Sequence, residues 1–202
     1  PAVKMIYLTG TKNVLDLADN LGYSTLKERS RFGLSLVLGG GEVKLLEHAA
    51  AFGVFATEGV KHEISPILKV EDPSGLVLEE WKDSSQEVLS SQVARQISSI
   101  LSDNDARSFI FGAQNYLTLP DRAVATKTGT TNDYHDAWTV GYTPELVTGV
   151  WVGNNDNAEM KKGADGSKIA APIWNAYMRQ ALSNTPPSSF NAPDEVITGK
   201  AI

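Results

Sequence analysis

Cysteine is absent from the 202-residue chain, which excludes disulfides and thiolate metal sites. Positive charge is in the minority, and the net charge of −6 gives no electrostatic support for nucleic-acid binding. Long apolar runs are also lacking, so no segment has the length of a membrane span, and no signal peptide is recognisable. The remaining balance, 42% hydrophobic and 21% charged residues, is typical of one globular domain.

The first half of the chain has mainly helical periodicity. Apolar spacing predicts a helix over residues 2–20, interrupted at 9–11 and ended by Gly22, and two further helices over 42–58 and 88–101. Residues 23–41 are predicted to form a loop. Between the last two helices, the turn sequence Asp72-Pro73-Ser74-Gly75 separates two apolar runs, 67–71 and 76–81, which predicts a β-hairpin.

The second half changes to strand patterning. Short β-branched and aromatic runs predict strands at 123–128, 137–142 and 146–152, and helical spacing returns at 171–182. Residues 1–183 are therefore predicted to form the folded part of the chain. Residues 184–202, which open with a Pro- and Ser-containing stretch, are predicted to be a loose tail.

The most informative short segment is Lys127-Thr128-Gly129-Thr130-Thr131, at the end of a predicted strand. Thr128 and Thr130 occupy alternate strand positions, so their hydroxyls are predicted to point to one side. Gly129 allows close approach of a ligand backbone, and Lys127 adds a positive charge. Together these groups can hold a carboxylate, and the Thr130 N–H can serve an oxyanion hole. The simpler interpretation is an ordinary strand edge with a turn, since K-T-G alone is common.

The surrounding sequence is more specific than this triplet. The stretch KTGTTNDYHDAWTVGYTPELVTGVWVGNND, residues 127–156, resembles the corresponding stretch of class A penicillin-binding proteins, the bifunctional peptidoglycan synthases of bacterial cell walls. Residues 33–43 and the helix after them resemble the central segment of that family, and residues 170–174 resemble its closing helix. The resemblance extends over nearly the whole chain, to about residue 182.

This resemblance implies a chemistry and its partners. The family acylates a serine with a peptide ending in D-Ala-D-Ala and passes the acyl group to an amine, and β-lactams imitate that peptide. Three motifs carry the reaction: S-x-x-K, S-x-N and K-T-G. By resemblance, Lys127, Thr128, Gly129 and Thr130 bind the substrate or β-lactam carboxylate, and the Thr130 N–H is an oxyanion donor. No metal or organic cofactor is implied.

Two segments imitate the other motifs. Ser24-Thr25-Leu26-Lys27 has the S-x-x-K pattern, and Ser102-Asp103-Asn104 has the S-x-N pattern. Ser24 lies in a predicted loop, although the nucleophile needs a helix start that brings its lysine onto the same face. The Ser102 triplet is better explained as a helix end and restart with Asp or Asn caps. We therefore expect neither segment to be catalytic.

The resemblance also predicts that the true serine, its lysine and the S-x-N precede residue 1, because Pro1-Ala2-Val3-Lys4 resembles the segment just after the family's S-x-N. The N-terminal part of the transpeptidase domain would then be a partner of this chain. The parent protein would also carry a glycosyltransferase domain and a membrane anchor, and would act outside the cytoplasm. We expect the chain alone to be inactive.

The patterns and the resemblance together predict an α+β fold, with an antiparallel sheet flanked by helices and the first strands supplied by the missing N-terminal part. His48, His62 and His135 lack metal spacing and are expected to be structural. Asp136 and Trp138 are expected to shape the turn and pack the next strand, and Trp151 and Trp174 to join the sheet to the last helix. Two rival functions stay open: a serine hydrolase of the same superfamily (a D,D-carboxypeptidase or β-lactamase) and a non-catalytic binding module.

Overall fold

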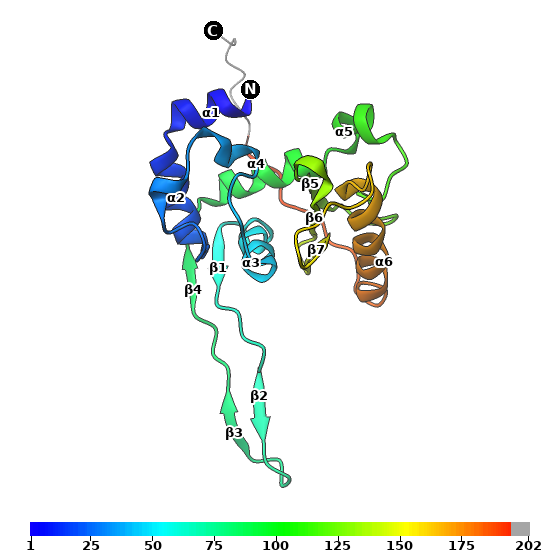
Figure 1. Cartoon of the computed structure of the whole chain (residues 1–202). Coiled ribbons are helices and arrows are strands. Elements are labelled where there is room, and N and C mark those ends of the chain that lie inside the picture. The colour runs from blue at the N-terminus through cyan, green and yellow to red at the C-terminus, as the bar shows by residue number, and fades with distance from the viewer. Residues whose placement is uncertain (195–202) are drawn as a thin grey trace.

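The computed structural model describes residues 1–194, and within them the chain forms an α+β structure (Figure 1). The N-terminal half contains α1 (Ala2–Thr9), α2 (Thr11–Leu21), the 3₁₀ turns η1 (Arg29–Arg31) and η2 (Leu34–Leu38), α3 (Leu45–Ala56), β1 (Val60–His62), β2 (Lys69–Glu71), β3 (Val77–Glu80) and β4 (Ser85–Glu87). The C-terminal half contains α4 (Ser91–Ser102), α5 (Asn104–Phe111), β5 (Ala125–Thr130), η3 (Asn132–Tyr134), β6 (Asp136–Tyr142), β7 (Val147–Gly153), the π-helix η4 (Gly166–Ala170) and α6 (Ala171–Ala181).

The central sheet has the strand order β5-β6-β7 with antiparallel pairing throughout, which confirms the predicted architecture. Its two faces are covered by different helices. A Cβ on Gly141 of β6 would lie 2.5 Å from Trp174 of α6, whereas Gly149, which is paired with Val140, faces Leu45 of α3. Since neighbouring residues in a strand point to opposite faces, α6 covers one face and α3 the other. The sheet core is thus closed on both sides.

Two glycines end the N-terminal helices where the sequence predicts. Gly10, with φ 85°, separates α1 from α2, and Gly22, with φ 101°, is a left-handed cap whose N–H bonds back to Ala18 and Asp19. Glycine adopts this conformation without the steric cost that a Cβ would add. The predicted helix over 2–20 is confirmed, including its interruption.

The predicted hairpin is confirmed as β2 and β3, which pair as Lys69 with Glu80 and Val70 with Glu79. Figure 1 shows it extending far from the rest of the chain. A second antiparallel pair at its base, β1 with β4, was not predicted from the sequence. These strands have three residues each and no apolar alternation, so periodicity gives no signal for them.

Other boundaries differ from prediction in ways that capping explains. The helix predicted over 42–58 is shorter, because Lys44 is extended and Glu58 and Gly59 have positive φ. The helix predicted over 88–101 begins at Ser91, because the Ser90 side chain caps the Val93 N–H. Within residues 1–194, no helix is long and apolar enough to cross a membrane.

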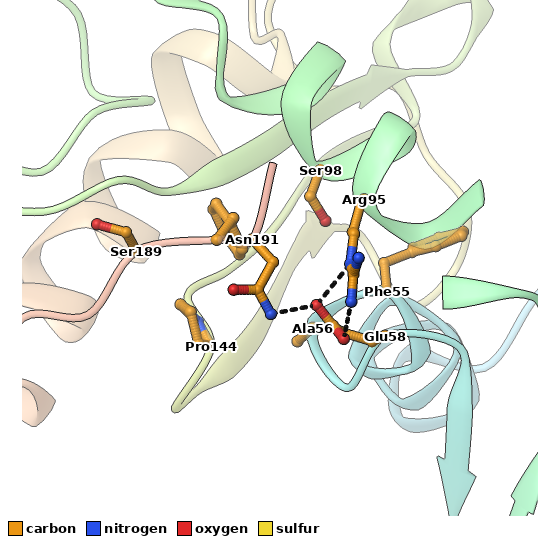
Figure 2. A pocket seen from close by; sticks show the side chains of 9 residues that line it. Phe55, Ala56, Glu58, Arg95, Ser98, Pro144, Ser189 and Asn191 are labelled. Atoms are coloured by element: carbon orange, nitrogen blue, oxygen red, sulfur yellow. Dashed lines mark hydrogen bonds and ion pairs between the residues drawn. The ribbon is translucent and has the colours of Figure 1, made fainter. Parts of the chain in front are cut away.

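Residues 184–194 contain no helix or strand, and they contact the body of the protein. The Asn191 amide donates to Glu58 at 2.6 Å, and Arg95 donates two bonds to the same carboxylate (Figure 2). The Phe190 ring packs edge-on against Tyr142. These groups surround a cavity of about 80 Å³ between α3, α4 and the tail. Residues 195–202 lie outside the described part of the chain.

Candidate active site

The K-T-G segment forms half of β5, the edge strand of the sheet as described. The Thr131 N–H donates to Asp136 O at 3.1 Å, so it points toward β6. Backbone groups alternate along an antiparallel strand, and therefore the N–H and C=O groups of Thr128 and Thr130 point to the free edge. Two contacts agree with this: Arg107 donates to the Thr126 carbonyl at 3.4 Å, and Lys127 Nζ donates to the Thr128 carbonyl at 2.6 Å.

Lys127 lies on the sheet face covered by α3, because it pairs directly with Val140. Gly129 shares this face, and its Cβ position lies 3.3 Å from Trp138 Cβ. Much of the Lys127 side chain is exposed to solvent. Its ammonium group nevertheless lies close to other protein atoms, and this partial burial lowers its pKa. The ammonium group therefore bends from the α3 face to the free edge, where it meets the Thr128 carbonyl.

Thr128 and Thr130 lie on the opposite face, since residues in alternate positions share a face. The Thr130 hydroxyl accepts a hydrogen bond from Gly166 N at 3.0 Å, and the Gly166 carbonyl accepts one from Thr139 at 3.1 Å. Gly166 is buried so tightly that a Cβ would lie 2.3 Å from Trp138 O and 2.6 Å from Gly129 O. The start of η4 therefore holds the Thr130 side chain in place.

The structure thus brings the sequence-predicted residues to one strand edge but not to one face. Lys127 and Gly129 lie on the α3 face, and Thr128 and Thr130 on the η4 face, so only their edge-directed atoms can contact one ligand. Sequence reasoning missed Gly166, because its contact with β5 spans 36 residues. The glycines at 163 and 166 were the available signal.

The two motif-like segments have other partners. The Ser24 hydroxyl donates to Glu47 at 2.7 Å and accepts from Lys44 at 2.8 Å, so the lysine that it contacts is not Lys27. The Ser102 hydroxyl donates to the Ser99 carbonyl at 3.2 Å. The Asp103 side chain caps α5 by accepting the Ala106 N–H, as predicted for a helix restart.

The histidines and the loop after β5 have structural contacts. His48 lies 2.7 Å from the Tyr23 hydroxyl and packs edge-on against Trp138, and burial lowers its pKa. His135 lies 2.7 Å from the Asn157 carbonyl. Asp136 accepts hydrogen bonds from Thr131 and Trp151, which confirms that it shapes this turn. In residues 1–194, no group of three or more His, Cys, Asp or Glu side chains could hold a metal ion.

Comparison with known proteins identifies the family of this chain. Residues 18–179 match the family described as "Penicillin binding protein transpeptidase domain". "Penicillin-binding protein 1A" of Aquifex aeolicus is 37% identical over 197 residues, covering 97% of this chain and 26% of that protein. The protein of the same name from Neisseria lactamica is 32% identical and covers 95% of this chain and 26% of its own length.

Solved structures give the same result. The penicillin-binding protein PonA1 of Mycobacterium tuberculosis superposes with a TM-score of 0.79 at 28% identity, covering 94% of this chain and 54% of that one. A second structure of PonA1, in complex with penicillin V, superposes with a TM-score of 0.76 at 29% identity and covers 93% of this chain and 54% of that one. The chain spans about a quarter (26%) of the length of the curated relatives it matches. By family match, sequence similarity and fold, this chain belongs to the penicillin-binding protein transpeptidase domain family, and its relatives are class A members of it.

Proposed function

We propose that β5 forms one side of a serine D,D-transpeptidase site that cross-links peptidoglycan stem peptides ending in D-Ala-D-Ala and is acylated by β-lactams. The observation that carries this proposal is the free edge of β5. It presents the backbone groups of Thr128 and Thr130 beside the Lys127 ammonium group.

Each group has a role in the proposal. An extended peptide pairs with the free strand edge through the Thr128 backbone, as in other β-strand additions. The Lys127 ammonium attracts the terminal carboxylate, and partial burial strengthens this attraction because fewer water molecules screen it. The Thr130 N–H donates to the oxyanion that forms when the peptide carbonyl is attacked. Gly129 leaves space above the strand for the ligand.

The nucleophile is proposed to come from a segment outside this chain. Within residues 1–194, Ser24 contacts Lys44 and Glu47, and Ser102 bonds to its own helix, so neither has the serine–lysine arrangement of the family. A complementary segment carrying S-x-x-K and S-x-N would cover apolar side chains that α1, η2 and α3 leave exposed. These are Met5 (59%), Tyr7 (71%), Leu8 (66%), Leu38 (70%) and Leu46 (63%). Covering them supplies the free energy for the two parts to associate.

The parent is proposed to be a class A penicillin-binding protein that acts outside the cytoplasm, attached to the cytoplasmic membrane by an anchor that precedes this chain. The relatives named penicillin-binding protein 1A support this, and the penicillin V complex of PonA1 supports β-lactam binding at the same fold. The acceptor amine comes from a second stem peptide.

Intact mass spectrometry with benzylpenicillin tests the proposal. The chain alone is expected to gain no penicilloyl mass. Co-expressed with the S-x-x-K and S-x-N segment of the Aquifex relative, it is expected to form a complex in which that segment's serine is acylated. Thr130→Pro removes the Thr130 N–H and is expected to slow acylation, whereas Thr131→Ser outside the strand is the control. An acylation rate that Thr130→Pro leaves unchanged would contradict the proposed oxyanion role.

The hydrolase alternative is separated by product analysis on the same complex. A transpeptidase transfers the acyl group to an added amine such as a D-amino acid, whereas a carboxypeptidase or β-lactamase gives only the hydrolysed acid. If the hydrolysed acid is the main product even at saturating amine, the function is hydrolysis and not transpeptidation.

A further inference from the structure

The segment of residues 63–83, which we call the arm, projects far from β5. It contains β2 and β3 with their turn, and Figure 1 shows it extending away from the helices and the central sheet. Among the element pairs that pack extensively within residues 1–194, β2 and β3 occur only with each other. The arm therefore contributes little to the core, and its sequence is free to serve another purpose.

The arm exposes apolar side chains that folding does not bury. Their exposed fractions are Ile64 52%, Ile67 58%, Leu68 65%, Leu76 62%, Val77 45% and Leu78 63%. Apolar side chains that stay in contact with water add little to the stability of a two-stranded hairpin. Clusters of exposed apolar side chains are typical of interaction sites. Their number on one short hairpin indicates that something covers them.

A groove lies at the base of the hairpin. It has a volume of about 230 Å³ and is lined by Ser65, Pro66, Ile67, Leu68, Lys69, Glu79 and Trp81. The Trp81 N–H donates to the Leu68 carbonyl at 2.8 Å, which holds the two sides of the groove together. In the part of the chain that the structure describes, both strands have an unpaired outer edge, because β2 and β3 form a two-stranded sheet. A bulge between Val70 and Glu71 interrupts regular pairing toward the tip and leaves the groove end as the better edge for another strand.

The charge of the arm selects its partner. Residues 63–83 carry six acidic and two basic side chains, a net charge of −4, against −6 for the whole chain. Glu79 and Glu80 make no ion pair within residues 1–194, and Glu79 lines the groove. A second copy would bring two arms of like charge together, which is unfavourable. A cationic chain would instead pair with these carboxylates while its apolar side chains enter the groove.

We propose that the arm docks an extended segment of another protein that alternates Lys or Arg with large aliphatic residues. The segment lies along the hairpin edge beside the groove, and its aliphatic side chains contact Leu68 and Trp81 on one face of the hairpin. Its cations lie on the other face beside Glu80, and Glu79 adds to the negative charge around them. This binding does not depend on the β5 site.

Fluorescence anisotropy with the purified chain tests the proposal, using a labelled heptapeptide of alternating Lys and Leu as the probe. The chain is expected to bind it, and to bind it more weakly as salt rises. The matched peptide with Glu in place of Lys is expected not to bind. Glu79→Gln with Glu80→Gln is expected to weaken binding about fivefold or more. The control pair Glu28→Gln and Asp121→Asn removes the same charge outside the arm, and is expected to change binding by less than about twofold.

The apolar contribution has its own matched pair. Leu68→Ser in the groove is expected to weaken binding about fivefold or more, whereas Ile100→Ser, at an aliphatic residue of α4 exposed to a similar degree (68% against 65%), is expected to have little effect. Equal loss in both variants, binding of the Glu peptide, or no binding of the Lys peptide would each overturn the proposal. If sedimentation shows a dimer that Leu68→Ser dissociates, the arm binds a second copy of this chain instead.

Discussion

Gly166→Ala tests the contact by which η4 holds the β5 site. The added methyl would lie 2.3 Å from Trp138 O and 2.6 Å from Gly129 O, and both are backbone atoms that no rotamer change can move. Overpacking of a tight interior costs about 1–3 kcal/mol. Because the neighbours are backbone, we expect the upper end, a loss of about 3 kcal/mol in the free energy of unfolding.

For a chain of this size, that loss corresponds to a fall in Tm of about 6–12 °C, which thermal unfolding by circular dichroism measures. Gly33→Ala is the control, because a Cβ there meets nothing within 4 Å. The same substitution should move η4 away from β5 and free the Thr130 hydroxyl, which changes the Thr130 amide resonance in NMR spectra. A Tm for Gly166→Ala within about 1 °C of the control would refute the packing argument.

Three further predictions concern stability and ionisation. Trp174 is 0% exposed and donates to the Thr148 carbonyl, so Trp174→Ala is expected to cost about 3–5 kcal/mol in urea unfolding, and a cost below about 1 kcal/mol would contradict its place in the core. Hydrogen bonds from Arg95 lower the pKa of Glu58 to about 2, so the stability that ionised Glu58 contributes is present above pH 4.5 and is lost as pH falls toward 2. Glu58→Gln should flatten the plot of unfolding free energy against pH in this range. An unchanged plot would exclude the Glu58–Arg95 pair as the source of the pH dependence. Burial lowers the pKa of His48 in the folded state, so as pH falls the unfolded state takes up the proton before the folded state does. Stability therefore falls as pH drops below about 6.5. An NMR titration that gives folded His48 a pKa at or above 6.5 would contradict this.

Much of the fold was predictable because its signals are local. Gly10 and Gly22 mark helix ends through their conformation, and Asp72-Pro73-Ser74-Gly75 marks the hairpin turn. The strands of the central sheet follow from runs of β-branched residues. The short pair β1 and β4 has no such pattern, and it forms because α3 and α4 bring its two ends together.

The candidate site was predictable as a strand but not as a three-dimensional arrangement. Alternation correctly placed Thr128 and Thr130 on one face. The same alternation puts Lys127 on the other face, so its ammonium group must bend round the free edge to join them. The contact with Gly166 depends on how the chain returns after β7, and no local pattern encodes that return. Long-range packing therefore decided the details that the motif left open.

The central claim is that this chain supplies one side of an acylated serine site while the serine lies elsewhere. Intact mass spectrometry after incubation with benzylpenicillin tests it most directly, with and without the complementary S-x-x-K and S-x-N segment. The account predicts no adduct on the chain alone, and an adduct that maps to the complementary serine when both parts are present. A stoichiometric penicilloyl adduct on the isolated chain, at Ser24 or any other residue, would contradict it.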